Sequence, residues 1–153
     1  MRAERSRLEC FAQDLGVADR VVFAGQVLPE SVLGSFDVFA LSSDTEQMPN
    51  AVLEAMAAGL PIASVDVGDV RMMVCRANQD FIAPRDDETA FAAAIERLLR
   101  EPATRERLGG GNKERVVAEF SLQRMFDRYS ELFLGHLIQS QNKNGNGRLH
   151  SGP

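Results

Sequence analysis

The chain has 153 residues, of which 44% are hydrophobic and 25% charged, and its formal net charge is −5. This length fits one domain with a hydrophobic core, and the composition excludes an intrinsically disordered chain. The negative charge argues against nucleic-acid binding, because such proteins usually present a basic surface. No apolar run approaches the roughly 20 residues of a membrane-spanning helix, and we expect no signal peptide at the N-terminus.

The two cysteines indicate the cellular compartment. Cys10 and Cys75 lack the spacing of a metal site or a disulfide framework. Both have apolar neighbours in the sequence, so we expect buried, reduced thiols. Reduced thiols are typical of intracellular proteins, and the sequence therefore predicts a cytoplasmic location.

Segments with helical and strand patterns alternate along the chain. A helix over 2–15 has apolar residues at helical spacing and ends at Gly16. The elements expected next are a strand over 21–25, a helical turn over 29–36, a strand over 37–42, a helix over 50–58, a strand over 61–66, a short helix over 68–75 and a strand over 81–83. The C-terminal part is expected to hold helices over 88–100, 102–119 (interrupted at 109–111) and 122–138, before a disordered tail over 139–153.

Strands that alternate with helices predict a Rossmann-like α/β fold, in which a parallel sheet has helices on both faces. Ligands of such sheets bind beyond the carboxyl ends of the strands. Gly25-Gln26-Val27, the loop over 42–49 and the segment Asp66-Val67-Gly68 each lie at the carboxyl end of a predicted strand. We therefore expect these three segments to meet at one ligand site.

The loop over 42–49 and the helix after it carry the most informative pattern. Pro49 suits the start of a helix, whose free N–H groups bind anions such as phosphate. Glu46 in the loop and Glu54 in the helix would repel a bare phosphate but accept hydrogen bonds from sugar hydroxyls. The pattern therefore suggests a sugar nucleotide. The alternative is that Glu46 is a solvated loop residue and Glu54 an ordinary helix former.

The longer segment from Leu41-Ser42-Ser43 to Leu53-Glu54-Ala55-Met56-Ala57-Ala58-Gly59-Leu60-Pro61 resembles the nucleotide-binding half of the retaining GT-B glycosyltransferases of family 4 (glycosyl transferase group 1). Val21-Val22-Phe23-Ala24-Gly25 and Pro84-Arg85-Asp86 match elements on either side, so the resemblance extends over about residues 2–135. It implies a C-terminal GT-B donor-binding domain over 1–138. Such a domain takes part in transferring a hexose from a nucleotide-diphosphate sugar, with retention of configuration, to a glycan or lipid-linked acceptor. Uridine, guanosine and adenosine all remain open as the base.

The resemblance implies roles for individual residues. Glu46 would be the catalytic residue that contacts the transferred sugar, and Glu54 would bind the ribose hydroxyls. The other implied donor-binding residues are Gly25, Met48, Pro49, Asn50 and Ala51, of which the last two would bind the diphosphate through their backbone N–H groups. Members of the family need no metal, so neither a metal site nor a further cofactor is expected.

Compared with the family pattern, the chain is expected to be truncated at its N-terminus. The family's donor domain opens with two more strands and a Gly-Arg-x-x-x-x-Lys element, and an acceptor domain precedes it. Upstream of Val21 there is room for one helix only. Each charge-assisted hydrogen bond lost costs about 1.5–3 kcal/mol, so we expect weak donor binding and no turnover from this chain alone. Arg71 and Arg76 are candidate replacements for the absent cations, the alternative being solvated arginines near a helix end.

A second hypothesis is a non-catalytic nucleotide-sugar binding or assembly module that completes a partner carrying the acceptor domain. A third is a fragment of a decayed gene that does not fold stably. For a full enzyme, the resemblance is compatible with polysaccharide biosynthesis and with peripheral attachment to a membrane.

Overall fold

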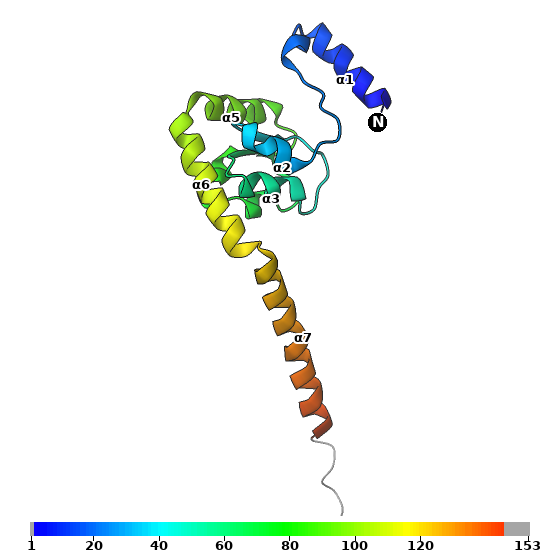
Figure 1. The fold of residues 1–153 in the computed structure, drawn as a ribbon, viewed down its shortest axis with the longest axis vertical. Coiled ribbons are helices and arrows are strands. Elements are labelled where there is room, and N and C mark those ends of the chain that lie inside the picture. Colours follow the sequence, from blue (N-terminus) through cyan, green and yellow to red (C-terminus); the bar gives the residue numbers. More distant parts are fainter. Residues whose placement is uncertain (1, 146–153) are drawn as a thin grey trace, which may run out of the picture.

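The structure, a computed structural model, describes residues 2–145, with side chains for residues 4–134. Its centre is a parallel three-stranded sheet in the order β1-β2-β3, formed by β1 (Phe39–Leu41), β2 (Ile62–Val65) and β3 (Ile82–Ala83). Phe39 is paired with Ile62, and Ser64 with Ile82. The predicted α/β fold with a parallel sheet is therefore confirmed (Figure 1).

Helices connect and flank these strands. The α-helices are α1 (Arg2–Asp14), α2 (Pro29–Val32), α3 (Asn50–Ala57), α4 (Val70–Met73), α5 (Glu88–Arg100), α6 (Pro102–Glu119) and α7 (Leu122–Gly145), and the 3₁₀ helices are η1 (Ala18–Arg20), η2 (Leu33–Ser35) and η3 (Arg76–Phe81). Helix α5 begins where the sequence predicts, because Asp87 Oδ1 accepts a hydrogen bond from Ala90 N at 2.8 Å and so caps the first turn.

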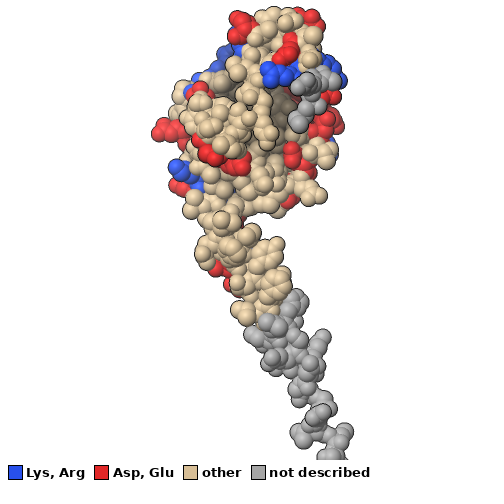
Figure 2. Space-filling view, turned by 45° about the vertical axis from the view of Figure 1, so that its right-hand side comes forward, with Lys and Arg blue, Asp and Glu red and all other residues tan. Residues whose placement is uncertain are grey.

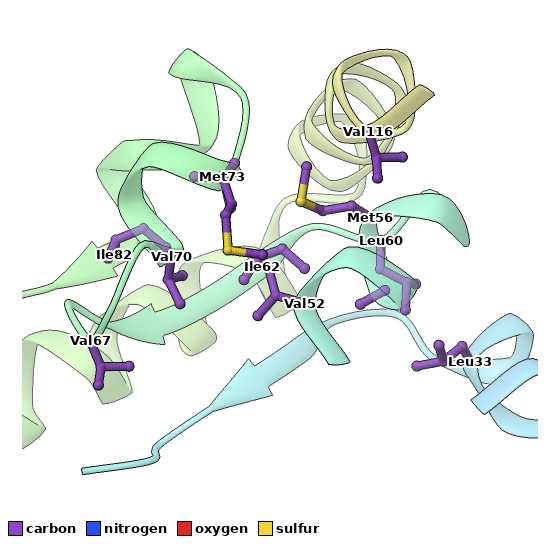
Figure 3. Close-up of a cluster of buried hydrophobic side chains, with 12 residues drawn as sticks. Leu33, Val52, Met56, Leu60, Ile62, Val67, Val70, Met73, Ile82 and Val116 are labelled. Atoms are coloured by element: carbon purple, nitrogen blue, oxygen red, sulfur yellow. The ribbon is translucent and has the colours of Figure 1, made fainter. Parts of the chain in front are cut away.

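The apolar core lies on both faces of the sheet. Ile62 and Ala63 are successive residues of β2 that point to opposite faces, and each belongs to a different cluster. The larger cluster combines Leu33, Val52, Ala55, Met56, Leu60, Ile62, Val67, Val70, Met73, Val74, Ile82 and Val116 (Figure 3). The smaller one combines Ala63, Phe81, Leu98 and Leu108.

Two buried amide side chains fasten the amino end of β2 to its surroundings. Asn78 Oδ1 accepts a hydrogen bond from Ile62 N at 2.9 Å, and Asn78 Nδ2 donates to Ile62 O at 2.7 Å. Asn112 Nδ2 donates to Leu60 O at 3.0 Å and to Asn78 Oδ1 at 2.8 Å, while Asn112 Oδ1 accepts from Cys75 N at 3.0 Å. The network joins η3, α6 and the strand, and sequence reasoning did not identify it.

The predicted strand over 21–25 does not form. These residues pair with no strand among the described residues, and Val22 is 88% exposed. β-Branched and aromatic residues favour extended backbone, but a strand also needs a hydrogen-bonding neighbour. The segment instead links α1 to the rest of the fold, and α1 stands apart from the sheet (Figure 1).

Helix α6 continues through the three glycines that were expected to interrupt it. A Cβ on Gly109 would lie 1.9 Å from the carbonyl oxygen of Gly59, and one on Gly111 would lie 3.1 Å from Cys75 Sγ. Packing against the end of α3 therefore overrides the low helix propensity of glycine.

Two other expectations need correction. Cys10 is exposed and Cys75 half-buried, so two buried thiols were wrongly predicted, and Cys10 is exposed because α1 lies away from the sheet. Helix α7 runs to Gly145, so residues 139–145 are helical. The rest of the predicted disordered tail, 146–153, lies outside the described residues.

Candidate functional site

The loop over 42–49 leaves the carboxyl end of β1 and leads into α3. The turn after β2 holds it on one side, because Asp69 N donates a 2.7 Å hydrogen bond to Gln47 O. Gly68 lies in the same turn with φ +53°, and a Cβ there would lie 2.1 Å from Gln47 O and 2.8 Å from Glu46 O. Only a residue without a side chain allows this approach, so the turn fixes the backbone at Glu46.

The N-terminus of α3 is open. Pro49 is buried and extended (φ −69°, ψ 116°), which aims the chain into the helix, and no side chain caps the helix. The backbone N–H groups of Asn50 and Ala51 have no acceptor among the described residues, and both residues are exposed. The site therefore offers two free donors at the positive end of the helix dipole.

The structure brings most of the predicted site residues onto this loop and helix. Glu46 is half-buried, Met48 is 44% exposed and Glu54 is exposed on α3. Glu54 lines a groove of about 430 Å³ between α2 and α3, together with Pro29, Glu30, Leu33, Gly34, Ala57 and Ala58. The two glutamates thus lie on either side of the free N–H groups along the chain.

Gly25 lies elsewhere. It has φ +73° and lines a hollow of about 840 Å³ with residues of α1 and with Phe23. Because residues 21–25 are not part of the sheet, their end does not reach its carboxyl edge. The loop after β1 and the turn after β2 do meet there, as expected.

The candidate replacement cations have different surroundings. Arg71 Nε is 2.6 Å from Asp66 Oδ2, and its Nη2 donates to Ile82 O at 2.7 Å. Arg71 therefore ties α4 to β2 and β3 and is not a free phosphate ligand, while its side chain is 40% exposed. The Arg76 side chain is exposed and forms no hydrogen bond or ion pair within the described part of the chain.

Sequence reasoning overlooked a second contact to the loop. Arg85, in the turn between β3 and α5, donates a hydrogen bond from Nη2 to the carbonyl oxygen of Asp44. A cavity of about 160 Å³ beside this contact is lined by Ser42, Ser43, Asp44, Val65, Arg85, Asp86, Asp87, Glu88 and Phe91. The sequence signal for this contact was an arginine two residues after the predicted strand over 81–83.

The sequence that forms this site matches a known family. The family described as glycosyl transferases group 1 matches residues 2–115. The chain belongs to this family. The resemblance noted from the motif is thereby confirmed.

Several curated glycosyltransferases are similar to this group 1 glycosyltransferase chain. The lipopolysaccharide core biosynthesis glycosyltransferase LpsE of Rhizobium meliloti is 34% identical over 130 residues, which are 84% of this chain and 38% of LpsE. The capsular polysaccharide biosynthesis glycosyltransferase CapM of Staphylococcus aureus is 27% identical over 75% of this chain and 30% of CapM. The chain thus spans well under half the length of these relatives.

A solved structure shows the same fold. Sucrose-phosphate synthase from Thermosynechococcus elongatus superposes with a TM-score of 0.72 at 31% identity, over 87% of this chain and 35% of that protein. The group 1 glycosyltransferase chain therefore has the α/β architecture of a GT-B enzyme.

Among its described residues, no helix is both long and apolar enough to cross a membrane. The described part also holds no group of three or more His, Cys, Asp or Glu side chains placed to bind a metal.

Proposed function

We propose that this chain is the donor-binding portion of a retaining glycosyltransferase that moves a hexose from a nucleotide-diphosphate sugar to a glycan or lipid-linked acceptor. The observation that carries the proposal is the open N-terminus of α3, whose free N–H groups lie between Glu46 and Glu54 along the chain. Anionic phosphates bind readily at such a helix end.

Each residue has a chemical part in this proposal. The N–H groups of Asn50 and Ala51 would bind the diphosphate and stabilise the negative charge that grows on it as the leaving group departs. Glu46 would contact the hydroxyls of the transferred sugar and stabilise positive charge at its anomeric carbon. Glu54, one turn further along α3, would accept hydrogen bonds from the ribose. The helix N-terminus would take the place of a metal ion.

The relatives guide the choice of acceptor. LpsE and CapM are named for lipopolysaccharide core and capsular polysaccharide biosynthesis, and we infer a related glycan or lipid-linked acceptor for the full enzyme. Because the chain spans 38% of LpsE, we expect the acceptor to bind outside it and no turnover by the chain alone. We place the enzyme in the cytoplasm, where nucleotide sugars would be its co-substrates.

Exposed apolar side chains favour a second candidate, a module that works with a separate partner carrying the acceptor domain. Leu122, Phe126, Tyr129 and Phe133 follow one another at three- and four-residue spacing along α7 and are 55–71% exposed. The face of α7 that Figure 2 shows is mostly uncharged over its described residues. Exposed apolar stripes of this kind mark interaction surfaces.

The unpaired segment over 21–25 is compatible with either candidate. In a Rossmann-like sheet the strands lie in the order 3-2-1-4-5-6. If the segment over 21–25 were strand 3 and β1 strand 4, strands 1 and 2 would lie between them. A partner or a longer chain that supplies those strands would pair both edges.

Nucleotide titrations followed by amide NMR test the leading proposal. UDP, GDP and ADP are added in turn to the wild-type chain and to the variants Glu54→Ala and Glu46→Ala, with Glu114→Ala on the exposed face of α6 as the matched control. We expect one nucleotide to shift the amides of Asn50 and Ala51. Glu54→Ala should weaken its binding about tenfold or more, the effect of losing a charge-assisted hydrogen bond.

Two outcomes of the titration would contradict the proposed donor site. Shifts that avoid the N-terminus of α3, or binding that Glu54→Ala leaves unchanged, would remove the donor site from this helix. A folded wild-type chain that binds no nucleotide until an acceptor-domain protein is added would favour the second candidate.

A further inference from the structure

The loop that carries Glu46 is held from two sides by different elements. On one side the turn after β2 contacts Glu46 and Gln47 through Gly68 and Asp69. On the other side Arg85 donates its Nη2 hydrogen bond to the carbonyl oxygen of Asp44, which is 41 residues away in sequence. The two attachment points, at Asp44 and at Gln47, enclose Glu46.

We propose that Arg85 is a positioning residue of the donor site, which holds the Asp44 carbonyl and thereby places Glu46 against the sugar of the donor. The inference rests on the proposed function, because it gives Glu46 a sugar to contact. In this role Arg85 would touch neither donor nor acceptor.

The surroundings of Arg85 support this role. Its neighbours Asp86, Asp87 and Glu88 are acidic, yet within the described residues Arg85 forms no ion pair and reaches across to a backbone carbonyl instead. Asp87 already caps α5 through Ala90 N. Asp86 has φ +63°, a conformation that costs a residue with a side chain about 1–2 kcal/mol. The tight turn before α5 thus presents Arg85 to the loop.

The size of the adjoining cavity argues against direct donor binding by Arg85. Pockets for small organic ligands are roughly 300–1,000 Å³, whereas the cavity beside Arg85 measures about 160 Å³. The four acidic residues that line this cavity, Asp44, Asp86, Asp87 and Glu88, would also repel a diphosphate. A contact that fixes the loop agrees with both observations.

The test separates positioning of Glu46 from general stabilisation. Arg85→Ala, Arg85→Lys and, as a matched control, Arg107→Ala on the exposed face of α6 are titrated by amide NMR with UDP, GDP and ADP and with the glucose ester of each. Since Glu46 would contact the sugar and not the nucleotide, Arg85→Ala should weaken binding of the glucose ester about three- to tenfold and leave that of the free diphosphate unchanged. Arg85→Lys should recover part of the lost affinity for the glucose ester. The amide signals of residues 44–48 should shift in Arg85→Ala but not in the control variant.

Equal weakening of the diphosphate and its glucose ester would overturn the proposal, as would unchanged amides over 44–48. If the wild-type chain binds the diphosphate and its glucose ester with equal affinity, the positioning role of Arg85 is refuted while the donor site is retained. If the folded wild-type chain binds neither ligand, the proposed function fails and the positioning role fails with it.

Discussion

Replacing Gly68 by alanine should disturb both the stability of the chain and the position of Glu46. The new Cβ would lie 2.1 Å from Gln47 O and 2.8 Å from Glu46 O, and Gly68 has φ +53°. Both contacts involve backbone atoms, which cannot avoid the methyl group by changing a rotamer. The loop or the turn must therefore move.

The cost has two parts that can be estimated separately. A left-handed conformation costs an alanine about 1–2 kcal/mol, and an extra methyl group in a closely packed site typically costs about 1–3 kcal/mol. Gly68→Ala should therefore lower the free energy of unfolding by about 2–5 kcal/mol. Gly16→Ala is the matched control, because Gly16 has φ +66° and no atom within 4 Å of the added Cβ, and it should lose only the conformational part.

Urea unfolding measures both variants, and amide NMR of Gly68→Ala reports the loop. We expect displaced amide signals at Glu46, Gln47 and Met48 and weaker binding of the nucleotide sugar. A loss no larger than that of Gly16→Ala, with unchanged loop amides, would refute the claim that close contact with Gly68 places Glu46.

Two further predictions concern the core, and urea unfolding tests both. Asn112→Ala should lower the free energy of unfolding by about 2–5 kcal/mol, because it leaves Leu60 O and Cys75 N without their partner; a loss under about 1 kcal/mol would contradict this reading. Gly109→Ala should destabilise the chain, since its Cβ would collide with a backbone oxygen at 1.9 Å, whereas Gly110→Ala, with no atom within 4 Å, should stabilise it by about 0.5–1 kcal/mol. Effects of the same sign for these adjacent glycines would disprove the close packing of α6 on α3.

Local patterns explain what could be predicted. The helix predicted over 88–100 matches α5 in both bounds, since an apolar stripe runs along it and the capping Asp87 directly precedes it. The helix predicted over 50–58 corresponds to α3, and the strand over 61–66 contains β2. Local patterns failed for the segment over 21–25. Its residues favour a strand, but none of the described strands pairs with it.

The sequence by itself determined the alternation of strands and helices, the family and the segment that carries Glu46 and Glu54. These features depend on periodicity, caps and motifs, which act over a few neighbouring residues. Only the tertiary structure decided that Gly68 and Arg85 hold the loop and that Asn112 reaches Asn78 across 34 residues. Such contacts join segments far apart in the chain, and they exist because close packing of the sheet and its helices brings those segments together.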